Sequence, residues 1–298
     1  MDQPRSSDGD SSAPGEPVAG LVRAQTAADP WNALRRFTPA RIALGRAGGS
    51  VPTRHQLAFR LDHARARVAV WSPFDAEELA QQLKTLGHAT LLVRSRARDR
   101  AEFLQRPDLG RCLDGESRSL LEKTARRGAG HDLVIILSDG LSTLAAATQS
   151  VPLVQALTGL LNRDRWSVAP IVVARHGRVA LQDEIGEIFR ARLSLMLLGE
   201  RPGLGSADSL GAYFTFDPKV GRHDADRNCV SNIRSGGIPP EAAAQKIHYL
   251  LTASRNLGMS GVRLKDDFLP VSVVDQAAQL AAGTSAEPGA AKPPKRLA

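Results

Sequence analysis

The segment that decides the fold is Leu193-Ser-Leu-Met-Leu-Leu198, which is followed at once by Gly199-Glu-Arg-Pro-Gly203. A short apolar run that stops at a charged Gly/Pro-rich stretch predicts a buried strand with an irregular loop at its carboxyl end. In open α/β sheets, ligands bind just beyond the carboxyl ends of the strands. We therefore expect this loop to lie near a binding site, where Glu200 could accept hydrogen bonds from a ligand or Arg201 could bind a carboxylate. The alternative is an internal Glu200–Arg201 ion pair that holds the loop.

A second unusual segment, residues 224–234 (DADRNCVSNIR), is dense in hydrogen-bonding side chains and shows no clear helical or strand period. Because Cys229, Val230 and Ile233 are interleaved with these polar residues, we expect a loop that is partly folded into a site. Nothing in the sequence places a general base beside Cys229, so a nucleophilic role is disfavoured. A small buried thiol is the commoner role for such a cysteine.

Apolar runs alternate with helical patterns through the middle of the chain. Strands are expected at 89–93, 133–137, 168–174, 193–198 and 212–216, the last with Tyr213 and Phe214 as packing residues. One of the helices between them is expected at 152–161. Strands separated by helices predict an α/β fold, here a Rossmann-like, mostly parallel sheet covered by helices on both faces.

One turn in this region has the composition of an anion site. Ser138-Asp-Gly-Leu-Ser142 follows a predicted strand and precedes a helix, so its backbone N–H groups could face an anion. The turn lacks the glycine spacing of nucleotide-binding loops, which favours an ordinary strand-to-helix connection. The sequence also leaves open a carboxylate cluster of Asp139, Asp183 and Glu200.

The two ends of the chain differ in composition from its middle. Residues 1–28 are rich in Ser, Asp, Gly and Pro, and residues 270–298 in Ala and Pro, so both are predicted to be disordered tails. Residues 29–88 are predicted to form an N-terminal helical domain. Residues 89–269 are predicted to form the Rossmann-like domain.

Capping signals define the helices expected in the N-terminal domain. Proline directly after a capping residue predicts short helices at 30–37 and 39–46. A longer helix is expected from Thr53, where Thr-Arg-His-Gln is a capping-box pattern, and its apolar residues at helical spacing form one stripe. A further helix is expected between Ser72-Pro73 and Gly87.

Composition excludes several functional classes. The 298 residues carry 39 Lys and Arg against 31 Asp and Glu, a net charge of +8, but only 4% aromatic residues, so a stacking platform for nucleic acid is not expected. The basic run 94–100 is expected to be a solvated surface. Two distant cysteines without metal-ligand spacing indicate neither a disulfide framework nor a metal site. No signal pattern or membrane-length apolar run is evident, and we expect a cytoplasmic protein without a membrane partner.

Short motifs occur in a fixed order across about residues 30–265. They are Arg41-Ile-Ala-Leu-Gly-Arg-Ala-Gly48, Arg106-Pro-Asp-Leu-Gly-Arg111, Ser138-Asp-Gly-Leu-Ser142, Gly177-Arg-Val179, Asp183-Glu-Ile-Gly-Glu187, Gly199-Glu-Arg-Pro-Gly-Leu204, Asp208-Ser-Leu210, Asp226-Arg-Asn-Cys-Val-Ser-Asn-Ile233 and Ser260-Gly-Val262. Taken together they resemble one family closely, the small (light) subunit of ethanolamine ammonia-lyase.

This resemblance implies a subunit that works only with a partner. In the family, a large subunit with a (β/α)8 barrel holds the substrate and the catalytic residues. The small subunit closes over adenosylcobalamin at the interface, and six large and six small chains assemble. The complex converts ethanolamine to acetaldehyde and ammonia by a radical mechanism that the cofactor initiates. The resemblance thus implies no catalytic residue on this chain.

The resemblance also implies the cofactor contacts. Through the Gly-Arg-Val, Gly-Glu-Arg-Pro-Gly and Asp-Arg-Asn-Cys motifs, the family's cobalamin-binding residues correspond to Val179, Glu200 and Cys229. Glu200 would accept hydrogen bonds from corrin amides, while the other two suit an apolar flank. Arg178, Arg201 and Asn232 are further candidates of lower rank.

Two questions stay open at this point. The N-terminal tail differs from an amphipathic targeting helix, so sorting into a bacterial microcompartment is undecided. The alternative function is a stand-alone Rossmann-like nucleotide-binding enzyme that uses the Ser138–Ser142 turn and Arg201.

Overall fold

The computed structural model of the chain describes residues 29–125 and 130–269, so the predicted tails at 1–28 and 270–298 lie outside it. Contacts divide the chain into two compact units, Met1–Arg60 and Leu61–Ala298.

The first unit contains little regular structure. A 3-10 helix, η1, spans Pro30–Phe37, and its capping residue Asp29 accepts a hydrogen bond from Trp31 N at 2.9 Å. The helix predicted at 39–46 is wrong, because that segment is irregular and Ala43 has a positive φ of 52°. It offers no apolar stripe that would repay the cost of ordering a helix.

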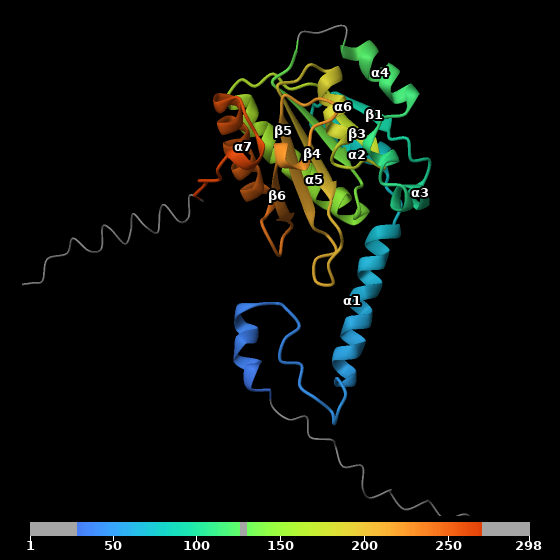
Figure 1. Cartoon of the computed structure of the whole chain (residues 1–298), viewed down its shortest axis with the longest axis vertical. Helices are drawn as coiled ribbons and strands as arrows, with labels where there is room; N and C mark the ends of the chain where they lie inside the picture. The colour runs from blue at the N-terminus through green and yellow to red at the C-terminus, as the bar shows by residue number, and fades with distance from the viewer. Residues whose placement is uncertain (1–28, 126–129, 270–298) are drawn as a thin grey trace, which may run out of the picture. The chain divides into compact units, whose positions relative to one another are not determined.

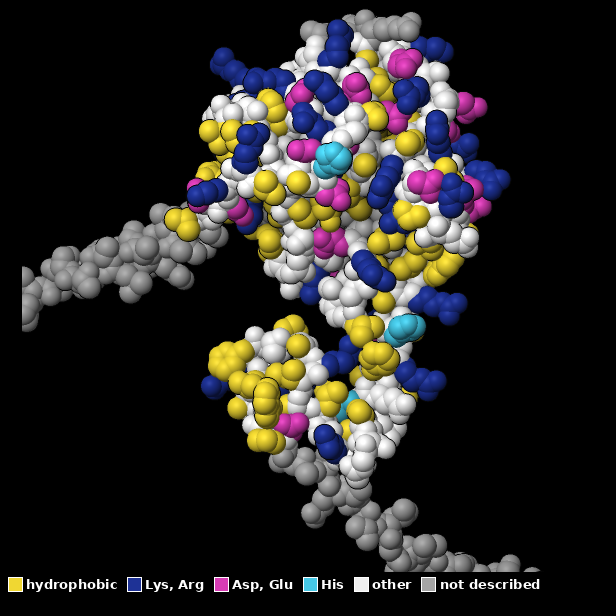
Figure 2. Space-filling view, viewed as in Figure 1, with side chains coloured by type: hydrophobic (Ala, Val, Ile, Leu, Met, Phe, Trp, Pro, Cys, Tyr) yellow, Lys and Arg dark blue, Asp and Glu magenta, His cyan; other side chains and the backbone are white. Residues whose placement is uncertain are grey.

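A long helix, α1 (Thr53–Trp71), begins at the predicted capping box and runs from the first unit into the second. Only Ala69 among its residues is buried. The predicted apolar stripe is therefore not a core stripe within this chain: Leu57 and Val68 are 58% and 61% exposed. Figure 2 shows hydrophobic side chains at the surface of the first unit.

The second unit is a six-stranded sheet with helices on its faces (Figure 1). The strands are β1 Thr90–Arg94, β2 Leu133–Ser138, β3 Ile171–Arg175, β4 Leu193–Gly199, β5 Leu210–Phe216 and β6 Arg227–Ile233. The helices are α2 Ala76–Thr85, α3 Arg100–Gln105, α4 Gly115–Ala125, α5 Thr143–Arg163, α6 Leu181–Ile188 and α7 Pro240–Leu257. Short 3-10 helices are η2 Leu109–Arg111, η3 Asp224–Asp226 and η4 Gly261–Arg263.

The strand order is β1-β3-β2-β4-β5-β6, and the sheet is mixed. β1, β3, β2 and β4 pair in parallel, whereas β5 is antiparallel to β4 and β6 is antiparallel to β5. The α/β class is confirmed, but the sheet is less parallel than the Rossmann-like prediction. No helix separates Gly199 from Leu210, and a connection without a crossover helix returns the chain antiparallel.

The segment 224–234, expected to be a loop, is η3 followed by the edge strand β6, so that prediction is wrong. The alternation of inward and outward side chains along β6 is not visible in the sequence, because the register with β5 shifts between Leu210 and Ala212. An irregularity of this kind displaces the side-chain period of two by one residue.

Helix starts also differ from the prediction at two places. α2 begins after Asp75, whose side chain accepts a hydrogen bond from Glu78 N, rather than at Ser72. α5 begins at Thr143 after Ser142, whose side chain caps Ala145 N, and it continues through Pro152, where the sequence suggested a start.

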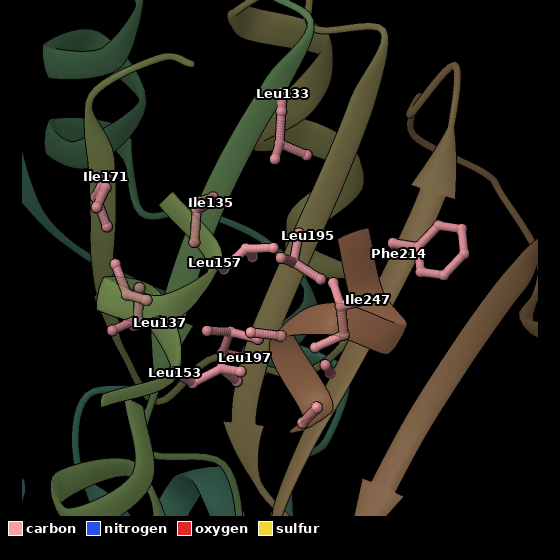
Figure 3. Packing of buried hydrophobic residues seen from close by; sticks show 14 of the residues in the cluster. Leu133, Ile135, Leu137, Leu153, Leu157, Ile171, Leu195, Leu197, Phe214 and Ile247 are labelled. Carbon is pink, nitrogen blue, oxygen red and sulfur yellow. The ribbon is translucent and has the colours of Figure 1, made fainter. Parts of the chain in front are cut away.

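One face of the sheet carries the larger core. Side chains of neighbouring strands, such as Ile135 and Leu195, pack with Leu157 of α5, and Ile247 of α7 completes this layer (Figure 3). By length and composition alone, α5 is the one helix in the described ranges that could cross a membrane. In this structure, the apolar side chains of α5 are buried against the sheet.

The opposite face is covered over only part of its width. α4 contacts β1, and α6 contacts β2 and β4. The helices that contact β5 and β6 most, α5 and α7, belong to the other layer. The second face of β5 and β6 therefore forms an open surface beside α6.

Candidate functional site

The open surface lies at the end of a row of paired side chains across three strands, which begins at the fully buried Met196. Met196 of β4 lies opposite Tyr213 of β5, which lies opposite Cys229 of β6. Tyr213 and Val179, which lies just before α6, pack on the same core cluster beneath α6. Three of these residues therefore share one face: Val179 at one side, Tyr213 in the centre and Cys229 toward the sheet edge.

Glu200 reaches this face from the end of β4. Its Oε2 atom accepts hydrogen bonds from Ser209 Oγ at 2.6 Å and from Asn232 N at 3.2 Å. The internal pair with Arg201 is not what holds the loop, because Ser209 and Asn232 do so, and Arg201 is exposed. No hydrogen bond to Glu200 Oε1 is found within the described residues, which leaves an acceptor available to a ligand.

Gly211 lets Glu200 and Tyr213 approach each other. A Cβ atom at this position would lie 2.7 Å from Tyr213 Cε2 and 3.0 Å from Glu200 Oε1. Both distances are too short for ordinary van der Waals contact, so any other residue would push the two side chains apart. A glycine here keeps a hollow that the carboxylate and the ring share.

The thiol of Cys229 is exposed rather than buried, contrary to the expectation from sequence. Desolvation by its neighbours nevertheless raises its pKa to about 11; the hydrogen bond with Tyr213 opposes this rise, and the negative charge of Glu200 adds a smaller increase. The thiol is therefore protonated near neutral pH. A protonated thiol is a poor nucleophile and behaves as a polarizable apolar contact.

Val179 lines a pocket of about 320 Å³ at the start of α6. Arg227, at the start of β6, also lines it and is buried. Arg227 donates to both carboxylate oxygens of Asp183, at 2.6 and 2.7 Å, and to Thr215 Oγ1 at 3.1 Å. Burial alone would lower the pKa of the guanidinium, but its hydrogen bonds with Asp183 raise that pKa above the ordinary value. This pair joins α6 to the edge strand.

The Ser138–Ser142 turn is satisfied internally. Asp139 is buried and accepts hydrogen bonds from His176 N at 2.7 Å, His176 Nδ1 at 3.0 Å and Arg100 Nη1 at 3.1 Å. Leu141 N donates to Gly199 O. The turn is therefore an ordinary strand-to-helix connection, as the lack of nucleotide-loop glycine spacing predicted.

The three acids named as a possible cluster serve different partners. Asp139 binds Arg100 and His176, Asp183 binds Arg227, and Glu200 binds Ser209 and Asn232. Each carboxylate has its own hydrogen-bond donors. A shared acid–base centre is therefore not what these residues form.

Sequence reasoning missed several residues of this region. Tyr213 had been interpreted as a packing residue, but it also faces the open surface. Arg100 was placed in a solvated basic run, yet its side chain is 14% exposed and also donates to the carbonyl groups of Val70, Gly140 and Leu141. Side-chain alternation along 210–216 is the signal that could have identified Tyr213 as facing away from Phe214.

In the ranges that the structure describes, no group of three or more His, Cys, Asp and Glu side chains is arranged to hold a metal ion. What the open surface offers instead is a free carboxylate oxygen, a phenol, a neutral thiol and an adjoining pocket. Such a surface can bind a large ligand that has both amide and apolar parts.

Comparison with known proteins identifies the relatives of this chain. Residues 28–265 match the family described as ethanolamine ammonia-lyase light chain (EutC). The ethanolamine ammonia-lyase small subunit of Ralstonia nicotianae is 52% identical over 239 residues, which cover 80% of this chain and 88% of the relative. The small subunit of Azotobacter vinelandii is 50% identical over 246 residues, covering 82% and 91%. That of Pseudomonas fluorescens is 50% identical over 240 residues, covering 80% and 88%.

Proposed function

Since the chain belongs to the ethanolamine ammonia-lyase light chain family, we propose that it closes an adenosylcobalamin site at the interface with the large subunit. The chain is a component of an ammonia-lyase complex. In this proposal the complex converts ethanolamine to acetaldehyde and ammonia in the cytoplasm, and six large and six small chains assemble. The large subunit holds the substrate and the catalytic residues.

The observation that carries the proposal is the convergence of Glu200, Tyr213 and Cys229 on one open face, with Val179 beside them. Corrin carries amide side chains around an apolar ring system, so its binding surface needs hydrogen-bond acceptors next to apolar contacts. Glu200 Oε1 is such an acceptor, and the neutral thiol of Cys229 and the side chain of Val179 are such contacts. This combination of a hydrogen-bond acceptor and apolar contacts therefore fits the group.

Each residue has a defined task in this site. Adenosylcobalamin, when bound, supplies the radical chemistry. Glu200 accepts hydrogen bonds and is kept in place by Ser209 and Asn232. Tyr213 and Cys229 would shield one side of the cofactor from water, and the high pKa of Cys229 keeps that side uncharged.

The need for a partner has a second line of support in the first unit. Trp31, Phe37 and Leu57 are 64%, 72% and 58% exposed. Exposed apolar groups at this density mark interaction surfaces in proteins. We assign this surface to contact with the large subunit.

The stand-alone nucleotide-binding alternative is not favoured. The Ser138–Ser142 turn, on which it depended, uses Asp139 and the N–H group of Leu141 for internal hydrogen bonds. Relatives over most of the chain carry the name of a subunit rather than of a complete enzyme.

The proposal is tested by co-expressing the chain with a large subunit and recording the absorbance spectrum of the purified complex after adding adenosylcobalamin. We expect a bound corrin spectrum and acetaldehyde formation that depends on both ethanolamine and the cofactor. Turnover by the small chain alone, or turnover indifferent to the cofactor, would refute the proposal.

A variant at Glu200 tests the site itself. Glu200→Gln keeps the shape but replaces a charged acceptor by a neutral one, so we expect the cofactor concentration for half-saturation to rise about tenfold. Glu241→Gln, at an exposed position at the start of α7 on the other layer, is the matched control. An unchanged cofactor requirement in the assembled Glu200→Gln complex would rule out the role given to this carboxylate.

A further inference from the structure

The pocket lined by Val179 carries positive charges that play no part in the proposed corrin contacts. Four arginines line it, Arg111, Arg178, Arg222 and Arg227, and Asp224 is the acidic residue in its wall. Its volume of about 320 Å³ is at the lower end for sites that bind small organic molecules. The pocket therefore offers many hydrogen-bond donors and a positive field in a confined space.

Two of the four charges are neutralised by acids within the fold. Arg227 is paired with Asp183, and its Nε lies 3.5 Å from Asp224 Oδ1. Arg222 donates to Asp217 Oδ2 at 2.9 Å. These two arginines shape the wall rather than supply free charge.

The charges of Arg111 and Arg178 are not neutralised by an acid in the described residues. Arg178 Nη2 donates to Phe103 O at 2.9 Å, and its guanidinium stacks over the Phe103 ring at 4.2 Å. Its Nε is buried and has no hydrogen-bond partner within residues 29–125 and 130–269. Desolvation, and then the positive charges of Arg100 and Arg111, lower the pKa of Arg178. A bound anion would relieve the repulsion between these guanidinium groups.

The geometry of the donors selects the kind of anion. Guanidinium groups present a rigid fork of N–H donors that matches phosphate oxygens, and arginine is over-represented where phosphate is recognised. Val179 and Ala180 at the start of α6 complete the lining, and a helix N-terminus favours negative charge.

The pocket is continuous with the open surface. Arg227 and Cys229 are two residues apart in β6, so their side chains point to the same face of the sheet. Val179 belongs to both the pocket and the proposed cofactor contacts. A ligand that contacts Val179 therefore touches a residue of the pocket wall.

From these observations we propose that the pocket binds a phosphate group, and that its occupant is the phosphodiester that links the nucleotide of cobalamin to the corrin. The second part rests on the proposed function, whereas the first does not. The same chemistry could come from free inorganic phosphate, and the experiment separates the two sources.

The test measures binding by absorbance in the two-subunit complex, with adenosylcobalamin and with cobinamide, which has the corrin but lacks the phosphodiester and the nucleotide. Arg111→Gln is the main variant, because Arg111 is exposed and its replacement leaves the fold intact; Arg178→Gln is the second. Arg163→Gln, exposed at the end of α5 on the other layer, removes the same charge elsewhere.

We expect each pocket variant to weaken cobalamin binding about tenfold, the worth of one charge-assisted hydrogen bond, and to leave cobinamide binding within about twofold. Arg163→Gln should change neither. Equal losses for both ligands, or no loss for either, would overturn the assignment to the phosphodiester.

A second arm uses the full-length small chain alone and follows its melting temperature with inorganic phosphate. Stabilisation by phosphate that Arg111→Gln abolishes supports the phosphate site, and if the cobinamide comparison shows no difference, free phosphate is the occupant. Absence of stabilisation together with no cobalamin–cobinamide difference refutes the site. Failure of the wild-type complex to bind any cobalamin refutes the proposed function alone, since the phosphate arm still decides the pocket.

Discussion

Replacing Asp183 by Asn gives the sharpest test of how the open surface is held together. Asp183 and Arg227 are 3% and 4% exposed, and two hydrogen bonds of 2.6 and 2.7 Å join them. Asp183→Asn keeps the shape but leaves the buried guanidinium with only the fully exposed Asp224, 3.5 Å from its Nε, as a counter-charge. Removing one partner of a buried pair typically costs about 3–5 kcal/mol, so we expect a loss of this size in the free energy of unfolding.

A neighbouring pair supplies the control. Asp217 and Arg222 form an ion pair at 2.9 Å, but Asp217 is 46% exposed. Because water screens such a pair, Asp217→Asn should cost at most about 1 kcal/mol. The double replacement Asp183→Leu with Arg227→Met removes both charges and should recover much of the loss.

The assay is urea unfolding of the full-length small chain, followed by circular dichroism, with wild type and the three variants at one pH. The slope of the transition should stay constant, so that midpoints report stability. If Asp183→Asn and Asp217→Asn lose similar small amounts, the buried pair is not what fixes β6 against α6, and the reasoning fails.

Two further predictions concern the thiol of Cys229 and the close backbone approach at Gly199. In a Cys112→Ser background, the rate of Cys229 alkylation by iodoacetamide should be slow near neutral pH and rise with a midpoint at about pH 11 instead of 9.0. The reason is that the folded state keeps the thiol protonated through that interval. A midpoint near 9.0 would contradict the desolvation of the thiol. Gly199→Ala should destabilise by about 3 kcal/mol in thermal unfolding, since its Cβ would lie 1.9 Å from Ser142 O, whereas Gly159→Ala in the open middle of α5 should stabilise by about 0.5–1 kcal/mol; equal effects would refute the close approach.

The central strands could be predicted from sequence because burial on both faces removes polar residues from them. All side chains of Leu133–Ser138 and Leu193–Gly199 are buried, so their apolar runs carry an unambiguous signal. The edge strand β6 could not be found in this way. Its Cys229, Ser231 and Asn232 are exposed, and tertiary pairing with β5 decides the conformation of the segment.

The residues of the candidate site show the same difference between local sequence signals and tertiary contacts. Glu200 was singled out because an unusual loop follows a recognisable strand, whereas Val179 was named only through the family resemblance. The pairing of Asp183 with Arg227 was not found, because 44 residues separate the two in sequence and no local pattern links them. The role of Gly211 could not be predicted from sequence either, because it depends on Tyr213 and Glu200 approaching it in space.

The exposed apolar groups of the N-terminal unit have a consequence for the amount of this protein in a cell. An unassembled copy displays Trp31, Phe37 and Leu57, and surfaces of this kind are what chaperones and proteases recognise. We therefore expect copies made in excess of the large subunit to be degraded faster than assembled copies.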